Sequence, residues 1–485
     1  MTVRKLCSTD DIRGLNIGLQ SAGYMTALFG IGILPFYIYL FGAGMVWVLV
    51  GVAAATFLLW GNIPFRLKRY HQRHNKVYTI PGYMQVRFRC KDNYMRVFIA
   101  SEIIILTSFL AAIFVKITGQ IMHNCTGLNS TTCGILMLAI ACFVLSFNGY
   151  VGIYKYTMLK VMVPLLAALV VTVYIILSLG FPRLVVNTMS TNIQGSVTQY
   201  LNIAYYRGGF LRVEDVITLV SNGFILAGLP FLYTICLKSV RGKQILSGRK
   251  YAVVFMLLMG LVSSFLGGVS RGFLFQKDTA VSFSEYVGDM FNVLFGQEEL
   301  IGVVVGLIYF LGVLAACYVI IECCVYNIAT ILCVDLFKSG AALRGRYNRA
   351  THGIYLSIFI TGFLITMLML ILPEEVTLNL MMQFVALLGC SVGTVVYLSL
   401  KWRRLTRQGA MAGVITGLVA IPIYRYVGIF GSEGIKYSLS EWLGVSPVSL
   451  ALVTTVFMIF FVSLITPPES QEVSQELYEI KSRIS

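Results

Sequence analysis

Long apolar runs separated by short polar connectors make up most of the chain. An apolar run of about 20 residues is long enough to cross the hydrocarbon core of a bilayer as a helix. The repeated runs therefore predict an all-α polytopic membrane protein. Read with their polar borders, they give twelve spans, numbered one to twelve in chain order, at about 15–41, 43–65, 95–122, 134–154, 157–181, 214–237, 251–273, 299–334, 352–372, 378–400, 410–428 and 447–466.

Two of these spans contain helix-breaking residues near their middle. The breakers are Gly23, Gly30, Gly32 and Pro35 in span one, and Gly223, Gly228 and Pro230 in span six. Backbone that leaves the helix inside a membrane is tolerated only where protein or a cavity satisfies its polar groups. Breaks at corresponding places in two halves indicate a transporter built from inverted repeats, with its site near the midplane. Close helix packing would explain each glycine by itself.

Composition supports the membrane assignment. The 485 residues are 58% hydrophobic and only 12% charged, with a mean hydropathy of +0.82, whereas about 25% of a soluble chain is charged. We expect one transmembrane domain over 15–466, between a cytoplasmic segment 1–14 and a cytoplasmic tail 467–485.

The net charge of +16 lies mostly in alternate connectors and not in a basic domain, so it does not indicate nucleic-acid binding. Lys and Arg are concentrated after spans two, six, eight and ten, while the opposite connectors carry Glu298, Glu299, Glu374 and Glu375. By the positive-inside rule the basic connectors and both termini are cytoplasmic. This arrangement predicts a multi-pass protein of the cell (inner) membrane.

Nothing in the sequence indicates catalysis or a bound metal or cofactor. The eleven cysteines include no C-x-x-C pair, and no phosphate-binding, zinc-protease or serine-hydrolase motif occurs in a usable context. Cys125 and Cys133, separated by seven residues in an outside connector, either form a disulfide or remain two free thiols.

Five stretches, taken in order, resemble the sodium:solute symporter family, in particular its bacterial sodium/proline branch. They are S-A-G at 21–23, T-I-P-G-Y-M-Q-V-R-F at 79–88, G-L-P at 228–230, L-A-A-C-Y-V-I-I-E-C with D-L-F-K over 314–338, and W-R-R-L-T-R-Q-G-A-M-A-G at 402–413. The resemblance covers nearly the whole chain. Only about fourteen residues precede span one, so the extra first helix of the family is absent here or was lost in the choice of start site.

The resemblance implies a leucine-transporter-type fold of five plus five helices. Spans one to five, about 15–181, would form one repeat, and spans six to ten, about 214–400, the inverted second repeat, with extra helices over 410–466. It implies a secondary active transporter working by alternating access, whose partners are a small-molecule solute and the lipid bilayer. It suggests no nucleic acid and no protein partner.

The sodium site departs from the family pattern. Family members bind sodium between spans one and eight through backbone carbonyls and adjacent Ser/Thr hydroxyls, because a dehydrated cation needs several oxygen ligands. By register those hydroxyls fall on Val319 and Ile320, which have none. We therefore expect sodium coupling to be lost or altered.

The positions that the family uses for proline also differ. The branch places an Asp just after S-A-G, a Gln in G-Q-P and aromatic residues in span six, and the corresponding residues here are Thr26, Leu229, Asn222 and Leu226. Proline as the substrate is therefore unsupported.

Four charged residues stand out inside the predicted spans, where an unpaired charge costs several kcal/mol. Glu102 and Lys116 lie within two turns of a span end, so we interpret them as snorkelling to the membrane surface. Lys160 follows Thr157 by one turn, at a place where the family tends to carry an Asp near sodium. Its ammonium would replace the ion or carry a proton; the alternative is that it reaches cytoplasmic water.

Glu322 lies near mid-depth of span eight, where a lone carboxylate is costly and a partner is expected. Lys160 is the first candidate. The alternative is a charge pair that only fixes helix register. His71 and His74, in the basic connector, read as solvated residues and not as ligands.

These observations predict a secondary active transporter of a small organic solute with a degenerate sodium site. If Lys160 replaces the ion, we expect uptake that does not need sodium, being either proton-coupled or facilitative. The alternative is a transport-incompetent sensor or scaffold with the same fold. Candidate substrate-binding residues are Ser21, Ala22, Gly23, Thr26, Asn222, Phe224 and Gly228. The candidate ion-coupling region comprises Ala22, Lys160, Val319, Ile320 and Glu322.

Overall fold

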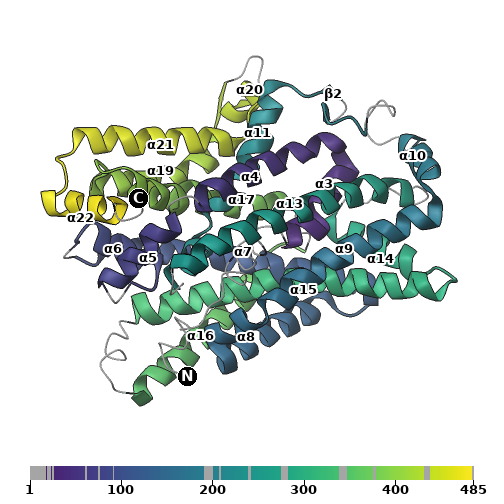
Figure 1. Ribbon diagram of the computed structural model, residues 1–485, viewed down its shortest axis with the longest axis horizontal. Coiled ribbons are helices and arrows are strands. Elements are labelled where there is room, and N and C mark those ends of the chain that lie inside the picture. The colour runs from purple at the N-terminus through teal and green to yellow at the C-terminus, as the bar shows by residue number, and fades with distance from the viewer. Residues whose placement is uncertain are drawn as a thin grey trace.

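The structure is a computed structural model and is almost entirely helical (Figure 1). It describes residues 18, 23, 27–60, 63–74, 77–90, 92–190, 200–206, 209–238, 242–274, 282–337, 347–374, 378–430 and 437–482. The first half contains η1 (Phe29–Ile33), α3 (Leu34–Phe41), η2 (Ala43–Val46), α4 (Trp47–Trp60), α5 (Ile63–His74), α6 (Ile80–Arg87), α7 (Tyr94–Thr126), α8 (Ser130–Lys155), α9 (Thr157–Leu179) and α10 (Phe181–Ser190).

The second half repeats the alternation of long and interrupted helices. It contains α11 (Val213–Phe224), η4 (Ile225–Gly228), α12 (Pro230–Lys238), α13 (Gly242–Phe273), α14 (Phe283–Phe295), α15 (Leu300–Ile331), η5 (Leu332–Leu336), α16 (Tyr347–Ile371), α17 (Leu378–Leu388), η7 (Gly389–Gly393), α18 (Thr394–Lys401), α19 (Arg407–Tyr426), α20 (Leu439–Leu443), α21 (Pro447–Ile465) and α22 (Gln471–Ser482). Two short antiparallel hairpins pair β1 (Tyr205–Tyr206) with β2 (Gly209–Phe210) and β3 (Gly428–Phe430) with β4 (Tyr437–Ser438).

Ten helices in the described part of the chain are long and apolar enough to cross a membrane. The two predicted spans outside this count are the interrupted ones. The continuous apolar helix in span one is only Phe29–Phe41, and span six is divided between α11 and α12. The count differs because span six consists of pieces shorter than the bilayer requires, and because residues 19–22 and 24–26 of span one lie outside the described residues.

The interruption in span six follows directly from its sequence. Gly228 ends the 3-10 turn η4, and Leu229 takes an extended conformation with ψ 125°. Pro230 then begins α12, where its fixed φ and missing N–H are tolerated at the first helical position. In span one, Gly30 and Gly32 lie in the π-helix η1, which directly precedes α3. A π-helix has a wider turn than an α-helix.

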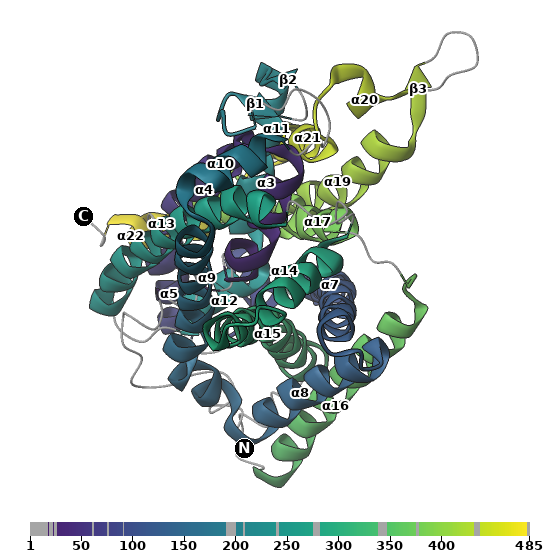
Figure 2. The same ribbon diagram turned by 90° about the vertical axis from the view of Figure 1, so that its right-hand side faces the viewer.

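The long helices run side by side, with α7 and α15 in the interior (Figure 2). α8 and α16 form one edge of the bundle, and α19 and α21 form the opposite edge in both views. Large apolar side chains such as Phe143, Leu177, Phe359 and Val453 point away from the bundle and are more than half exposed. An apolar surface of this extent is that of a protein surrounded by lipid.

The two repeats place similar connectors at opposite ends of the bundle. Between spans two and three, α5 and α6 pack at the end that carries the basic connectors, called the basic end below, and α6 contacts α12 of span six. Between spans seven and eight, α14 lies at the opposite end and contacts η1 of span one. Each connector therefore lies against the interrupted span of the other repeat, as inverted symmetry requires.

The C-terminal helix α22 lies across the basic end beside α5 and α6 (Figure 1). Leu477 is fully buried, and the buried Glu476 faces Arg73, His74 and Arg89 at 2.6–3.6 Å. The segment predicted as a tail is thus a docked amphipathic helix over most of its length.

Candidate substrate and coupling site

Lys160 on α9 and Glu322 on α15 meet inside the bundle. The Lys160 Nζ donates to both carboxylate oxygens of Glu322 at 2.7 Å. The Tyr318 hydroxyl, one turn earlier on α15, donates to Oε1 of the same carboxylate at 3.0 Å, and its ring lies 5.0 Å from the ammonium. The expected pairing of the two residues is confirmed, and no role in coupling follows from the geometry alone.

Glycines allow spans one, five and eight to pack closely against one another. A Cβ on Gly23 of span one would lie 2.3 Å from the side chain of Val161, the neighbour of Lys160. A Cβ on Gly312 of α15 would lie 2.4 Å from Ala167 of α9 and 2.8 Å from Ile31 of η1. Glycine leaves room at each contact. Span one therefore approaches span five next to Lys160, and spans one, five and eight meet at Gly312, several helical turns along α15 from Glu322.

Val319 and Ile320, the positions expected by register to replace the sodium-binding hydroxyls of the family, lie on α15 within one turn of Glu322. Val319 is buried and Ile320 is half-buried, packed against the apolar core. Neither side chain offers an oxygen to a cation. Among the described residues, the side-chain oxygens next to these two positions on α15 belong to Tyr318 and Glu322. The Tyr318 hydroxyl and the Lys160 ammonium both donate to the Glu322 carboxylate.

The predicted substrate residues are only partly described. Ser21, Ala22 and Thr26 lie outside the described residues. On α11, Asn222 and Phe224 are half-buried next to the interruption of span six. They therefore lie on the element expected to line a midplane site.

The glycines of span six are held in tight helix contacts. A Cβ on Gly223 would lie 2.2 Å from the Val48 carbonyl of α4, and one on Gly228 would lie 2.6 Å from the Cα of Gly389. A Cβ on Gly393 would in turn lie 2.3 Å from the Cα of Gly228. The interruption of span six thus packs against the π-helix η7 of span ten. No sequence motif predicted this contact.

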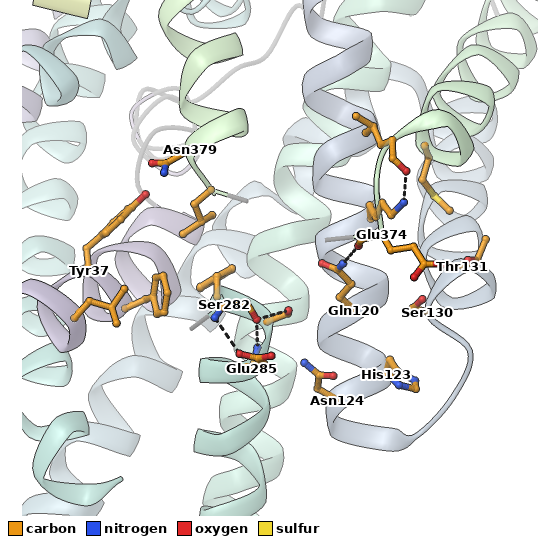
Figure 3. Close-up of a pocket in the computed structure, with 18 of the residues that line it drawn as sticks. Tyr37, Gln120, His123, Asn124, Ser130, Thr131, Ser282, Glu285, Glu374 and Asn379 are labelled. Carbon is orange, nitrogen blue, oxygen red and sulfur yellow. Dashed lines mark hydrogen bonds between the residues drawn. The ribbon is translucent and has the colours of Figure 1, made fainter. Parts of the chain in front are cut away.

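A cavity of about 790 Å³ opens at the end opposite the basic end. Figure 3 shows Tyr37 and Asn379 on one side of it and Gln120, Ser130 and Thr131 on the other. Its wall also carries charged groups and aromatic rings, including Phe36, Phe41, Lys116, Glu285 and Glu374. No sequence pattern predicts this cavity, because its lining comes from the ends of several spans and from connectors.

Of the two residues interpreted as snorkelling to the membrane surface, the interpretation of Glu102 is wrong. Its side chain is only 6% exposed and bonds to Ser391 of η7, so it points into the bundle and not toward the membrane surface. Lys116 is half-buried and donates from Nζ to the Leu372 carbonyl at 2.6 Å, at the wall of the cavity. The depth of a residue along a span does not say which face of the helix it occupies.

Two of the quoted motifs meet near the basic end. The Thr79 hydroxyl, from T-I-P-G-Y-M, donates to Oδ1 of Asp335, from D-L-F-K, at 3.0 Å. Arg96 Nε donates to the same oxygen at 2.7 Å. This cluster ties α6, α7 and η5 together and explains why these residue types stand at those places.

Two further expectations concern histidines and cysteines. His71 bonds to the Val77 carbonyl at 2.7 Å and His74 to Glu476 at 2.6 Å, so both are half-buried structural residues and not simply solvated. Cys125 and Cys133 are both free thiols. Within the described residues, no group of three or more His, Cys, Asp or Glu side chains is arranged to hold a metal.

Comparison with known proteins covers nearly the whole chain. The model of the sodium:solute symporter family matches residues 9–417. The sodium/proline symporter 2 of Staphylococcus saprophyticus is 24% identical over 459 residues, covering 92% of this chain and 84% of the relative. The high-affinity proline transporter of Bacillus subtilis is 23% identical over 463 residues, covering 93% and 90%.

Solved structures give the same fold. A Na⁺-coupled sialic acid symporter in a substrate-bound outward-open state is similar with a TM-score of 0.73 and 14% identity, covering 96% of this chain and 93% of that one. A transporter of the nucleobase-cation-symport-1 family has a TM-score of 0.54 and 14% identity, covering 95% and 96%. Both neighbours have the leucine-transporter fold, which confirms the predicted fold class.

Proposed function

This chain belongs to the sodium:solute symporter family, and we propose that it moves a small organic solute with the Lys160–Glu322 pair in the place of a sodium ion. The family and the fold of its structural neighbours support a secondary active solute transporter and not an enzyme. The proposal concerns what this member does at the crossing of spans one, five and eight.

The observation that carries the proposal is the double contact of Lys160 Nζ with Glu322, 2.7 Å to each oxygen. A sodium ion between spans one and eight would need oxygens from α15. Val319 and Ile320 have none, and the carboxylate next to them is already neutralised by an ammonium. A fixed cation on α9 supplies the positive charge that a bound ion supplies elsewhere, and it cannot dissociate.

A permanent cation changes the energetics of transport. A bound ion adds its gradient to the transport cycle only if it enters on one side and leaves on the other. Lys160 stays attached to the chain, so uptake would not respond to a sodium gradient. The remaining modes are coupling to protons and facilitated diffusion.

The cavity at the end opposite the basic end, called the outer cavity below, favours a polar or amphipathic solute as the substrate. Its wall mixes aromatic rings with amide groups and with charges of both signs, among them Phe36, Gln120 and Glu285. Ligand sites combine apolar surface with a few polar groups that fix orientation. The names of the relatives and neighbours make proline, sialic acid and a nucleobase the first solutes to test.

The test is uptake into proteoliposomes after a thermal-shift screen of these solutes, since a true ligand raises the melting temperature by mass action. We expect the rate of uptake to be unchanged when sodium is replaced by potassium. As a matched variant, K160A/V319S/I320T removes the ammonium and restores both hydroxyls, and it should become sodium-dependent. Uptake by the unmodified chain that stops without sodium would refute the proposal.

The same observation favours a second candidate, a solute sensor or scaffold that does not transport. A charge pair that holds α9 to α15 in one geometry would also suit a protein whose spans no longer rearrange. Ligand-induced thermal shifts together with absent flux, in both the unmodified chain and K160A/V319S/I320T, would establish that candidate.

A further inference from the structure

Glu102 is a buried carboxyl that the proposed function does not use. It lies on α7 of span three, in the half nearer the basic end, and its side chain is 6% exposed. One oxygen, Oε1, contacts the Ser391 hydroxyl, and the other, Oε2, is buried without a hydrogen-bond partner among the described residues. Asp335 also has one buried oxygen without a partner, but its other oxygen pairs with Arg96, whereas Glu102 has only a hydroxyl.

The charges on elements packed against α7 are engaged elsewhere. Lys160 pairs with Glu322 of α15, and Arg96 of α7 itself pairs with Asp335 of η5. The remaining described groups that could face Glu102 bond to other partners or lie at the ends of α7: Arg87 to the Ser399 carbonyl, Lys116 to the Leu372 carbonyl, Glu285 at the start of α14, and the Cys390 thiol toward the Val448 carbonyl. No cation among them lies within ion-pair distance of Glu102.

Counting hydrogens at Ser391 decides the state of the carboxyl. The Ser391 Oγ lies 2.5 Å from the Leu387 carbonyl, one turn back on its own helix, as well as in contact with Oε1 of Glu102. A serine hydroxyl has one hydrogen, whereas a carbonyl has none to give. If Ser391 donates to Leu387, the hydrogen between Ser391 and Glu102 must come from Glu102.

We propose that Glu102 and Ser391 form a proton-binding site, loaded in this conformation and separate from the Lys160–Glu322 pair. The loaded site is a chain in which the Glu102 carboxyl donates to the Ser391 hydroxyl, which donates to the Leu387 carbonyl. An ionised Glu102 would take the hydrogen of Ser391 instead, leave Leu387 without it and place an unpaired charge in the bundle, at a cost of several kcal/mol.

The Glu102–Ser391 site lies next to the interruption of span six, so a change in its charge would act on that interruption. Ser391 stands in η7 between Gly389 and Gly393, and both glycines contact the Ile225–Gly228 turn of span six. On its other side, the Ser391 backbone lies 2.5–2.6 Å from where a Cβ on Gly417 of α19 would be. With so little free space, loss of the proton would shift η7 against span six. The protonation itself stands whether or not transport is proton-coupled.

Infrared spectroscopy of the full-length protein in lipid nanodiscs tests the site with protons and deuterons as the only probe. A protonated carboxyl shows a C=O stretching band that shifts in D₂O, and an ionised carboxylate does not. We expect such a band at neutral pH in the unmodified protein, its loss in E102Q, and its retention in E322Q as the matched control. Glutamine keeps the size of the side chain and a donor for Ser391.

S391A gives a second test that leaves Glu102 in place. We expect the C=O band to remain but to move in frequency, because its hydrogen-bond partner is gone. Spectra of E102Q identical to those of the unmodified protein, or a band that S391A does not move, would overturn the proposal.

Discussion

Two carboxyl groups, those of Glu322 and Glu102, are buried in similar apolar surroundings in this bundle but have different hydrogen-bond partners. Glu322 on span eight has a cation, Lys160, and a hydroxyl, Tyr318, so both of its oxygens are satisfied as a carboxylate. Glu102 on span three has one hydroxyl, Ser391, which is already turned toward a carbonyl. The partner, and not the depth in the membrane, decides whether a buried acid is held as a charge or as a neutral group.

The largest effect should come from removing the cation of the first carboxyl. K160A leaves Glu322 buried with only Tyr318, and breaking one side of a buried ion pair costs about 3–5 kcal/mol. The free energy of unfolding, measured by denaturant titration in detergent micelles, should fall by that amount. The double variant K160M/E322L removes both charges and should recover most of the loss. If the double variant lost as much unfolding free energy as K160A, the destabilisation would not come from leaving Glu322 without its cation.

A smaller effect is expected where span six meets span ten, beside the second carboxyl. In G393A, the new methyl group would lie 2.3 Å from the Cα of Gly228, so backbone must move. Overpacking of this kind costs about 1–3 kcal/mol. G268A, on α13 with no atom within 4 Å of its new Cβ, is the control and should melt at the temperature of the unmodified protein. Equal melting temperatures for both variants would show that the η7 backbone can move away from Gly228 at little cost in stability.

Removing the partner of the second carboxyl should cost less than removing the cation of the first. S391A takes one neutral hydrogen bond from a buried group, an effect of about 1 kcal/mol. If Glu102 were ionised, Ser391 would be the only donor to a buried charge and the loss would approach that of K160A. A comparison of the two unfolding free energies therefore sharpens the contrast between the sites.

The smallest effect should be found at exposed charges. Arg73 Nη1 lies 2.7 Å from Glu479, and both side chains are about half exposed. E479A removes this exposed partner and leaves Arg73 its contact with the buried Glu476, so it should lower the free energy of unfolding by only about 0.2–1 kcal/mol. That difference should shrink further at high salt, which screens exposed pairs more than buried ones. Unfolding curves at low and high salt would check this, and a salt-independent loss would mean that Glu479 acts through packing.

The fold was predictable because its signals repeat along the chain. Apolar runs set the spans, and the Gly-Leu-Pro at 228–230 set the interruption of span six. The Lys160–Glu322 pair was predictable because two opposite charges in apolar runs have few other ways to avoid their desolvation cost.

The Glu102 site and the outer cavity were not predictable in this way. The partner of Glu102 is a serine 289 residues away, and serines are common in membrane helices. Only the packing of α7 on α17, the helix that continues into η7, shows that this serine and this glutamate meet. The cavity depends likewise on how the ends of separate spans and connectors assemble, as with Tyr37 and Asn379.

The docked helix α22 has a practical consequence for anyone handling this protein. Its last described residues include Ile480, which is buried and whose carbonyl accepts a bond from Arg69. A purification tag or fluorescent reporter joined directly after α22 would begin only a few positions beyond this contact and would compete with the docking of the helix. A long flexible spacer before any fusion partner would keep the native arrangement intact.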